Sequence, residues 1–220
     1  MRYKYLLLDA DGTFLDFNKA EEKALGMTFE QAGLETSPNI VADYNRINKQ
    51  MWEALERGEI TRERLRSLRF EKLGEIYPQA GGFMAQSYVE NLAKCVFFLD
   101  GGEDFLKKAS EICDIAVVTN GITSVQTSRL GLINVDKYAK TVVISDQCGV
   151  SKPDKSLAHI ALERLGCTDK KQALIVGDSV SADVQLGINS GIDTCLVFAK
   201  SHLSTYCADS YEQVLSIIKG

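Results

Sequence analysis

The chain has 220 residues, of which 45% are hydrophobic and 25% charged, so it can bury the core of one large domain or of a domain with an insertion. A net charge of -5 and a pI near 5.2 argue against a surface that binds nucleic acid polymers. The N-terminal apolar stretch, Tyr5 to Leu8, is too short for a signal peptide or for a membrane span of about 20 residues. We therefore expect a soluble globular protein without a membrane or polymer partner.

The 6 cysteines are scattered, mostly in apolar segments, and no two form a Cys-x-x-Cys pair. Isolated thiols in apolar surroundings are typical of reduced, structural cysteines in proteins of a reducing compartment. The sequence therefore predicts a cytoplasmic protein, and it leaves open whether the chain is a monomer or a homodimer.

The first predicted strand, in YLLLDADGT, ends in two carboxylates, Asp9 and Asp11, which Gly12 and Thr13 follow. If the strand persists, Asp9 and Asp11 project from the same face and lie close together. Two carboxylates at such a spacing repel each other unless a cation neutralises them. Mg²⁺ suits one or two carboxylates together with a phosphate, so this stretch is a candidate magnesium site.

Residues 15–95 show the periodicity of four amphipathic helices and no period-two alternation. Ser37 with Pro38 marks the beginning of one helix and Thr61 that of another. We expect these helices to form a small bundle that acts as a lid over one edge of the sheet. The predicted domains are this helical segment, 15–95, and an α/β domain made of residues 1–14 and 96–220.

From residue 100 onward, short runs rich in Val and Ile alternate with helical patterns. Runs that are apolar on consecutive residues are typical of strands covered on both faces. Together with the first strand they predict an α/β fold with a doubly wound parallel sheet. The predicted strands are 114–121, 140–146, 172–178 and 193–199, and the predicted crossover helices are 124–130, 155–165 and 182–190.

Polar residues stand at the ends of several predicted strands, where open α/β sheets bind their ligands. Pro153 disfavours helix at the residue before it, Lys152, and so holds that lysine in an extended loop. Gly121 would permit close approach of an anion to the turn after its strand. The polar candidates are Thr119 and Asn120 in VVTNG, Lys152 in GVSKPDK, and Asp178 and Asp183 in GDSVSAD.

In this order, DADGT, VVTNG, the lysine of SKP and GDSVSAD resemble the four signature motifs of the haloacid dehalogenase (HAD) superfamily of phosphohydrolases. The resemblance covers nearly the whole chain and implies a Rossmann-like core with a type 1 helical cap. Within the superfamily, residues 44–70 together with VVTNG and ISDQCGVSKPDK resemble the pyrimidine 5′-nucleotidases. Dehalogenation is disfavoured, because members that cleave carbon–halogen bonds typically lack the second aspartate, here Asp11.

The resemblance implies a Mg²⁺-dependent phosphomonoester hydrolase that forms an aspartyl-phosphate. Asp9 would be the nucleophile, and Asp11 would protonate the leaving alcohol and then deprotonate water. Thr119 and Lys152 would complete the catalytic set by binding the phosphoryl oxygens. The implied metal ligands are Asp9, the Asp11 carbonyl and Asp178, with Asp183 at the edge of the site; the implied phosphate-binding residues are Asp11, Thr119, Asn120 and Lys152.

The cap would select the substrate. Asn45, Asn48 and Trp52 fall at steps of three and four beside the apolar stripe of their helix. With Arg69, they could stack on and hydrogen-bond a flat base. Alternatively, Trp52 simply covers the bundle, the asparagines are solvated, and Arg69 pairs with a neighbouring glutamate.

Three functions are compatible with these motifs. The first is a 5′-nucleotidase whose partner is a small phosphorylated metabolite, a pyrimidine nucleoside monophosphate. The second is a sugar-phosphate phosphatase or phosphomutase of the same superfamily, which shares the four motifs. The third is a non-catalytic module on this fold, which the complete set of motif residues disfavours.

Overall fold

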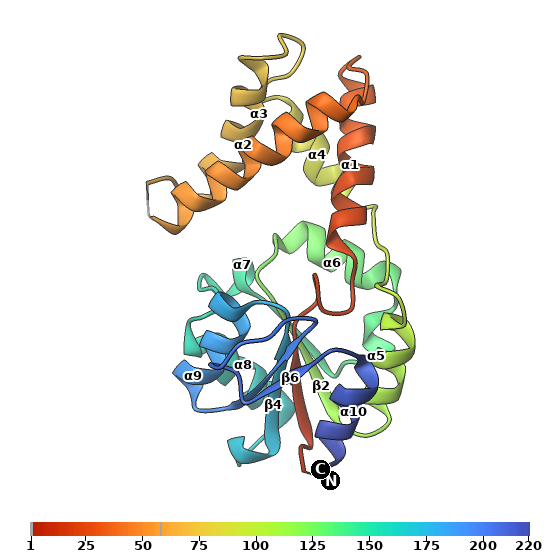
Figure 1. Cartoon of the computed structure of the whole chain (residues 1–220), viewed down its shortest axis with the longest axis vertical. Helices are drawn as coiled ribbons and strands as arrows, with labels where there is room; N and C mark the ends of the chain where they lie inside the picture. The colour runs from red at the N-terminus through yellow and green to blue at the C-terminus, as the bar shows by residue number, and fades with distance from the viewer. Residues whose placement is uncertain (1, 58) are drawn as a thin grey trace. The chain divides into compact units, whose positions relative to one another are not determined.

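The computed structural model describes residues 2–57 and 59–220 (Figure 1). By its internal contacts the chain divides into two compact units. One unit combines the residues up to Phe17 with Val96–Gly220, and the other is Asn18–Cys95. Among the described residues, no helix combines the length and the apolar character that crossing a membrane requires.

The larger unit is built on a six-stranded sheet in the order β3-β2-β1-β4-β5-β6, in which every neighbouring pair is parallel. β1 lies between β2 and β4, and therefore Leu6, Leu7 and Leu8 are all buried. The predicted parallel sheet is confirmed, and the short edge strand β6 is an addition to it. The strands are β1 Tyr5–Leu8, β2 Asp114–Thr119, β3 Thr141–Ile144, β4 Ala173–Gly177, β5 Asp193–Val197 and β6 Tyr206–Ala208.

Helices cover both faces of this sheet (Figure 1). Leu8 packs in one core cluster with Phe105 of α5 and Val214 of α10, and Leu7 packs in another with Leu157 of α8, because successive strand residues point to opposite faces. The predicted crossover helices are present, except that the third begins as a π-helical turn, Val180–Val184. The helices are α5 Gly102–Ser110, α6 Thr123–Leu132, α7 Ser145–Cys148, α8 Lys155–Leu165, α9 Gln185–Ser190 and α10 Tyr211–Lys219, with 3₁₀ turns at Val135–Lys137 and Lys170–Gln172.

The smaller unit contains the four helices that the sequence predicts. Two of them begin after the expected capping residues: Ser37 Oγ accepts a hydrogen bond from Ile40 N, and Thr61 Oγ1 accepts one from Arg64 N. Aromatic rings form the centre of this bundle, and the ring centroids of Tyr44 with Phe70 and of Phe70 with Tyr88 are 5.5 Å apart. The helices are α1 Phe17–Gln31, α2 Pro38–Glu56, α3 Arg62–Gly74 and α4 Met84–Leu92.

Candidate active site

Three central strands bring the candidate residues to one edge of the sheet. Asp9 directly follows β1, and its N–H donates to Val176 O at 2.9 Å, which continues the pairing with β4 by one residue. Thr119 is the last residue of β2, and Asp178 directly follows β4. The carboxyl ends of parallel strands meet at the same edge, so motifs far apart in the sequence share one site.

Asp11 does not continue the strand. β1 ends at Leu8, and Gly12 has a φ of +81°, a left-handed conformation that turns the chain and that glycine adopts readily. The N–H groups of Phe14 and Leu15 donate back to Ala10 O at 3.1 and 2.9 Å, which closes the turn. The expectation that Asp9 and Asp11 share a strand face requires the strand to persist, and this condition is not met. The Asp11 carboxylate instead contacts Gln126 and Arg129 of α6.

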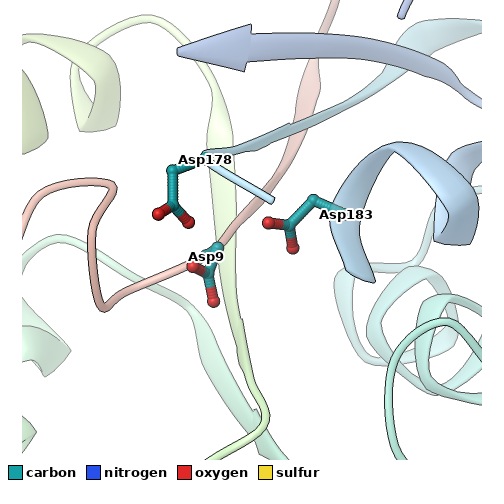
Figure 2. A group of neighbouring side chains, drawn as sticks. All are labelled: Asp9, Asp178 and Asp183. Atoms are coloured by element: carbon teal, nitrogen blue, oxygen red, sulfur yellow. The ribbon is translucent and has the colours of Figure 1, made fainter. Parts of the chain in front are cut away.

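Asp9, Asp178 and Asp183 form an acidic cluster whose ligand oxygens lie within 4.8 Å of one another (Figure 2). Asp9 and Asp183 are buried, at 8% and 2% exposure, whereas Asp178 is exposed. Two glycines make room for the cluster. A Cβ on Gly12 would lie 2.2 Å from Asp178 Oδ2, and a Cβ on Gly177 would lie 2.2 Å from Asp183 Cγ.

Lys152 supplies a positive charge to the cluster. Its Nζ donates to Asp9 Oδ1 at 2.5 Å and to Asp183 Oδ1 at 2.7 Å, and the residue is 6% exposed. Asn120 holds the lysine in place: Asn120 Oδ1 accepts from Lys152 N at 2.8 Å, and Asn120 Nδ2 donates to Lys152 O at 3.0 Å. The amide of Asn120, a predicted phosphate ligand, is thus engaged with the lysine backbone.

Burial dominates the electrostatics of Asp9. It raises the pKa of Asp9 to about 7, against the lowering effect of Lys152 and with a further rise from Asp183 and Asp11. Burial also raises the pKa of Asp178, with Asp183 adding to the effect. For Lys152, burial lowers the pKa, but Asp9 and Asp183 outweigh it and hold the lysine protonated. Without a further cation, burial therefore favours a protonated carboxyl group in the cluster over full ionisation.

The donor set fits a divalent cation that prefers oxygen ligands. Four carboxyl groups, those of Asp9, Asp11, Asp178 and Asp183, face two cations, Lys152 and the buried Arg129, so full ionisation would leave an excess of two negative charges for a divalent cation to neutralise. Asp9 and Asp178 are the residues that could hold Mg²⁺ directly. Both oxygens of Asp183 accept hydrogen bonds, from Lys152 Nζ and from Ser179 N, but both oxygens of Asp9 do so as well, from Lys152 Nζ and from Thr13 Oγ1. Hydrogen bonding therefore does not separate the two carboxylates, and the place of Asp183 at the edge of the site, like the role of the Asp11 carbonyl, stays a prediction.

Sequence reasoning missed Gln126 and Arg129, two residues of α6. Gln126 Nε2 donates to Asp11 Oδ2 and to Thr119 Oγ1, each at 2.7 Å, and Arg129 Nη1 lies 2.8 Å from Asp11 Oδ1. Their spacing of three on the helix after VVTNG was the available signal, but it is also the spacing of an ordinary helix surface. The structure requires glycine at position 121 for a reason other than the approach of an anion, because a Cβ there would lie 2.3 Å from Gln126 Cγ.

The cap residues differ in their surroundings. Asn45 is exposed, Asn48 is half-buried, and Trp52 is 43% exposed. Arg69 is 5% exposed: its guanidinium lies 4.5 Å from the ring centroid of Tyr88, and Nη1 donates to Asn48 Oδ1 at 3.2 Å.

The contacts bear on two of the alternatives, solvated asparagines and an ion pair between Arg69 and a neighbouring glutamate. Asn48 Nδ2 also donates to Glu21 Oε1 at 3.4 Å, so this asparagine is held from both ends of its amide and is not simply solvated. Glu71 forms its ion pair with Arg64, at 2.6 Å, instead of with Arg69. Arg69 therefore belongs to a polar network inside the bundle.

Known proteins are similar to this chain over most of its length. Residues 6–197 match the family model of the haloacid dehalogenase-like hydrolases. The pyrimidine 5′-nucleotidase PynA of Streptococcus pneumoniae is 35% identical over 228 aligned positions, which cover 99% of this chain and 96% of PynA. The pyrimidine 5′-nucleotidase YjjG of Escherichia coli is 30% identical over 195 positions, 89% of this chain and 86% of YjjG.

Among solved structures, the HAD-hydrolase YfnB of Bacillus subtilis, crystallised with magnesium bound, superposes with a TM-score of 0.92. Its sequence is 31% identical, and the superposition covers 100% of both chains. The family match covers most of the sequence and includes the strands that carry Asp9, Thr119 and Asp178. The chain belongs to the haloacid dehalogenase-like hydrolase family.

Proposed function

We propose that this protein is a Mg²⁺-dependent phosphatase that forms an aspartyl-phosphate on Asp9 and acts on pyrimidine nucleoside 5′-monophosphates. The observation that carries the proposal is the buried Asp9 at the end of the central strand, in contact with Lys152 and within the acidic cluster. The pyrimidine 5′-nucleotidases PynA and YjjG, with similar sequences over most of the chain, support the substrate class.

In the first step, an oxygen of Asp9 bonds to phosphorus and the bond between phosphorus and the alcohol oxygen breaks. Asp11 in its protonated form gives its proton to that oxygen, so the products are the free alcohol and phosphorylated Asp9. Lys152 and Thr119 bind the phosphoryl oxygens, and Asn120 orients Lys152 through its backbone. Thr13 Oγ1 donates to Asp9 Oδ2 at 3.2 Å and orients the nucleophile.

In the second step, ionised Asp11 takes a proton from water while the water oxygen bonds to phosphorus. The bond between phosphorus and the Asp9 oxygen breaks, so inorganic phosphate leaves and Asp11 is protonated again for the next cycle. Mg²⁺, when bound, supplies positive charge that favours an ionised Asp9 and offsets the repulsion between the carboxylates and a dianionic phosphate.

For the cap, we propose that Asn48 and Trp52 recognise the base and that Asn45 lies at the margin of the same helix face. Trp52 lies one helical turn after Asn48 on α2, so ring and amide share a face. A partly exposed indole can stack on a base, and a held amide offers one donor and one acceptor beyond those it already uses. Arg69 then acts through Asn48, whose orientation it fixes.

Phosphate release with Mg²⁺ from purine and pyrimidine monophosphates and from sugar phosphates tests the proposal. Asp9→Asn provides the blank, and Asp136→Asn, at an exposed position away from the cluster, provides the matched control. We expect release that favours pyrimidine nucleotides and disappears only with Asp9→Asn. Release from sugar phosphates alone would refute the nucleotide assignment, and full turnover by Asp9→Asn would refute the nucleophile.

A further inference from the structure

The helix α6 directs two fully buried polar side chains at the active site. Gln126 and Arg129 are 1% and 0% exposed, and their spacing of three places them on the same face of the helix. Burial of a charged side chain is unfavourable unless the charge is paired and hydrogen-bonded. The charge of Arg129 is paired with Asp11, a carboxylate of the site itself.

One hydrogen-bond network joins these side chains to two site residues. Arg129 Nη1 lies 2.8 Å from Asp11 Oδ1 and donates to Oδ2 at 3.1 Å. It also donates to Gln126 Oε1 at 3.1 Å, which fixes the orientation of the amide. Gln126 Nε2 is therefore free to donate to Asp11 and to Thr119, and it does so at 2.7 Å each.

Gly121 preserves the space that this network needs. An ideal Cβ at this position would lie 2.3 Å from Gln126 Cγ and 2.7 Å from Gln126 Nε2. Any larger residue would displace the amide from Asp11 and Thr119. Gly121 therefore leaves room for the side chain of Gln126, the fourth residue of α6.

Stability alone does not account for the arrangement. A buried ion pair is weak evidence of stabilisation, because well-packed apolar residues are often as stable or more so. The Asp11 side chain is 24% exposed, so water could solvate it without a buried arginine. The network instead ends on the carboxylate and the hydroxyl that the proposed reaction uses, where small errors of position are expected to slow catalysis.

We propose that Gln126 and Arg129 are positioning residues that hold the Asp11 carboxyl group for proton transfer and, through Gln126, fix the Thr119 hydroxyl. The inference rests on the proposed function, in which the proton of Asp11 passes to the alcohol oxygen as the bond between phosphorus and that oxygen breaks. Neither residue touches the substrate in this role.

The test compares leaving groups. For Arg129→Met we expect kcat for an alkyl phosphate to fall on the order of 10²-fold, the range of a misplaced general acid. The loss for p-nitrophenyl phosphate should be much smaller, since its leaving group needs little protonation. Arg129→Lys should restore part of the alkyl activity, and Gly121→Ala should show the same selectivity with both side chains retained.

Leu130→Ala is the matched control, because Leu130 is buried on the same helix but packs in the core. It should lower stability and leave the ratio of the two substrates unchanged. If Arg129→Met lowers both substrates by one common factor, the positioning role is refuted.

If the wild-type protein releases no phosphate from any substrate, the proposed function fails, and crystal structures then decide the positioning role separately. A displaced Asp11 side chain in Arg129→Met would support that role, and an unchanged Asp11 would overturn it.

Discussion

Alanine at Gly12 would test whether the turn after β1 shapes the metal site. At a φ of +81° an L-residue costs roughly 1–2 kcal/mol of stability. The new Cβ would lie 2.2 Å from Asp178 Oδ2, so the Asp178 side chain must rotate away. Because Asp178 is exposed, we expect this rotation to add little to the loss of stability while removing a metal donor.

Gly166→Ala is the matched control, because Gly166 has a φ of +69° and no heavy atom lies within 4 Å of an ideal Cβ there. Both variants should lose a similar free energy of unfolding, about 1–2 kcal/mol, because both hold alanine in a left-handed conformation. Only Gly12→Ala should also lose part of the stabilisation that Mg²⁺ gives to the wild-type protein. Denaturant unfolding with and without the metal measures both effects.

The size of the expected loss follows from the linkage between Mg²⁺ binding and folding. At a Mg²⁺ concentration about 100 times the wild-type Kd, binding stabilises the folded state by about 2.7 kcal/mol. Mutation of residues that only support metal ligands typically weakens metal affinity about 10–100-fold, so displacing a ligand itself should reduce that stabilisation to about 1.4 kcal/mol or less, and to about 0.4 kcal/mol for a 100-fold loss. If Gly12→Ala needed the same Mg²⁺ concentration as the wild-type protein for half-maximal stabilisation and for half-maximal phosphate release, the reasoning would be refuted.

Three further substitutions test other parts of the protein. Lys152→Met leaves Asp9 and Asp183 without their buried cation, so without Mg²⁺ the free energy of unfolding should fall by about 3–5 kcal/mol; an unchanged value would contradict the electrostatic account. Burial raises the pKa of Glu21 against the lowering effects of Tyr88 and Arg69, so the folded state binds more protons, and stability is lost as the pH rises from about 4.5 through the folded pKa. In thermal denaturation between pH 4.5 and 7.5, Glu21→Gln should lose less stability with rising pH than the wild-type protein. Equal losses in the two proteins would contradict this role of Glu21. Trp52→Ala should raise KM for nucleotides but not for p-nitrophenyl phosphate, and equal KM changes would leave Trp52 only a covering role.

Local sequence determined the elements and most of the site. Consecutive apolar residues marked five strands of the parallel sheet, and Ser37 and Thr61 marked two helix starts, because these signals act between residues near one another in the chain. Asp9, Thr119 and Asp178 could be placed at one edge for the same reason: each follows or ends a parallel strand, and such ends meet.

Tertiary structure alone decided where the remaining side chains point. β1 ends at Leu8 and the turn at Gly12 follows, so Asp11 lies outside the strand and contacts Arg129, which is 118 residues away in the sequence. Nothing local distinguishes Arg129 from a solvated helix arginine, since its burial depends on the packing of α6. Arg69 likewise contacts the rings of Tyr44 and Tyr88, which belong to other helices of the cap, so its own helix could not identify these partners.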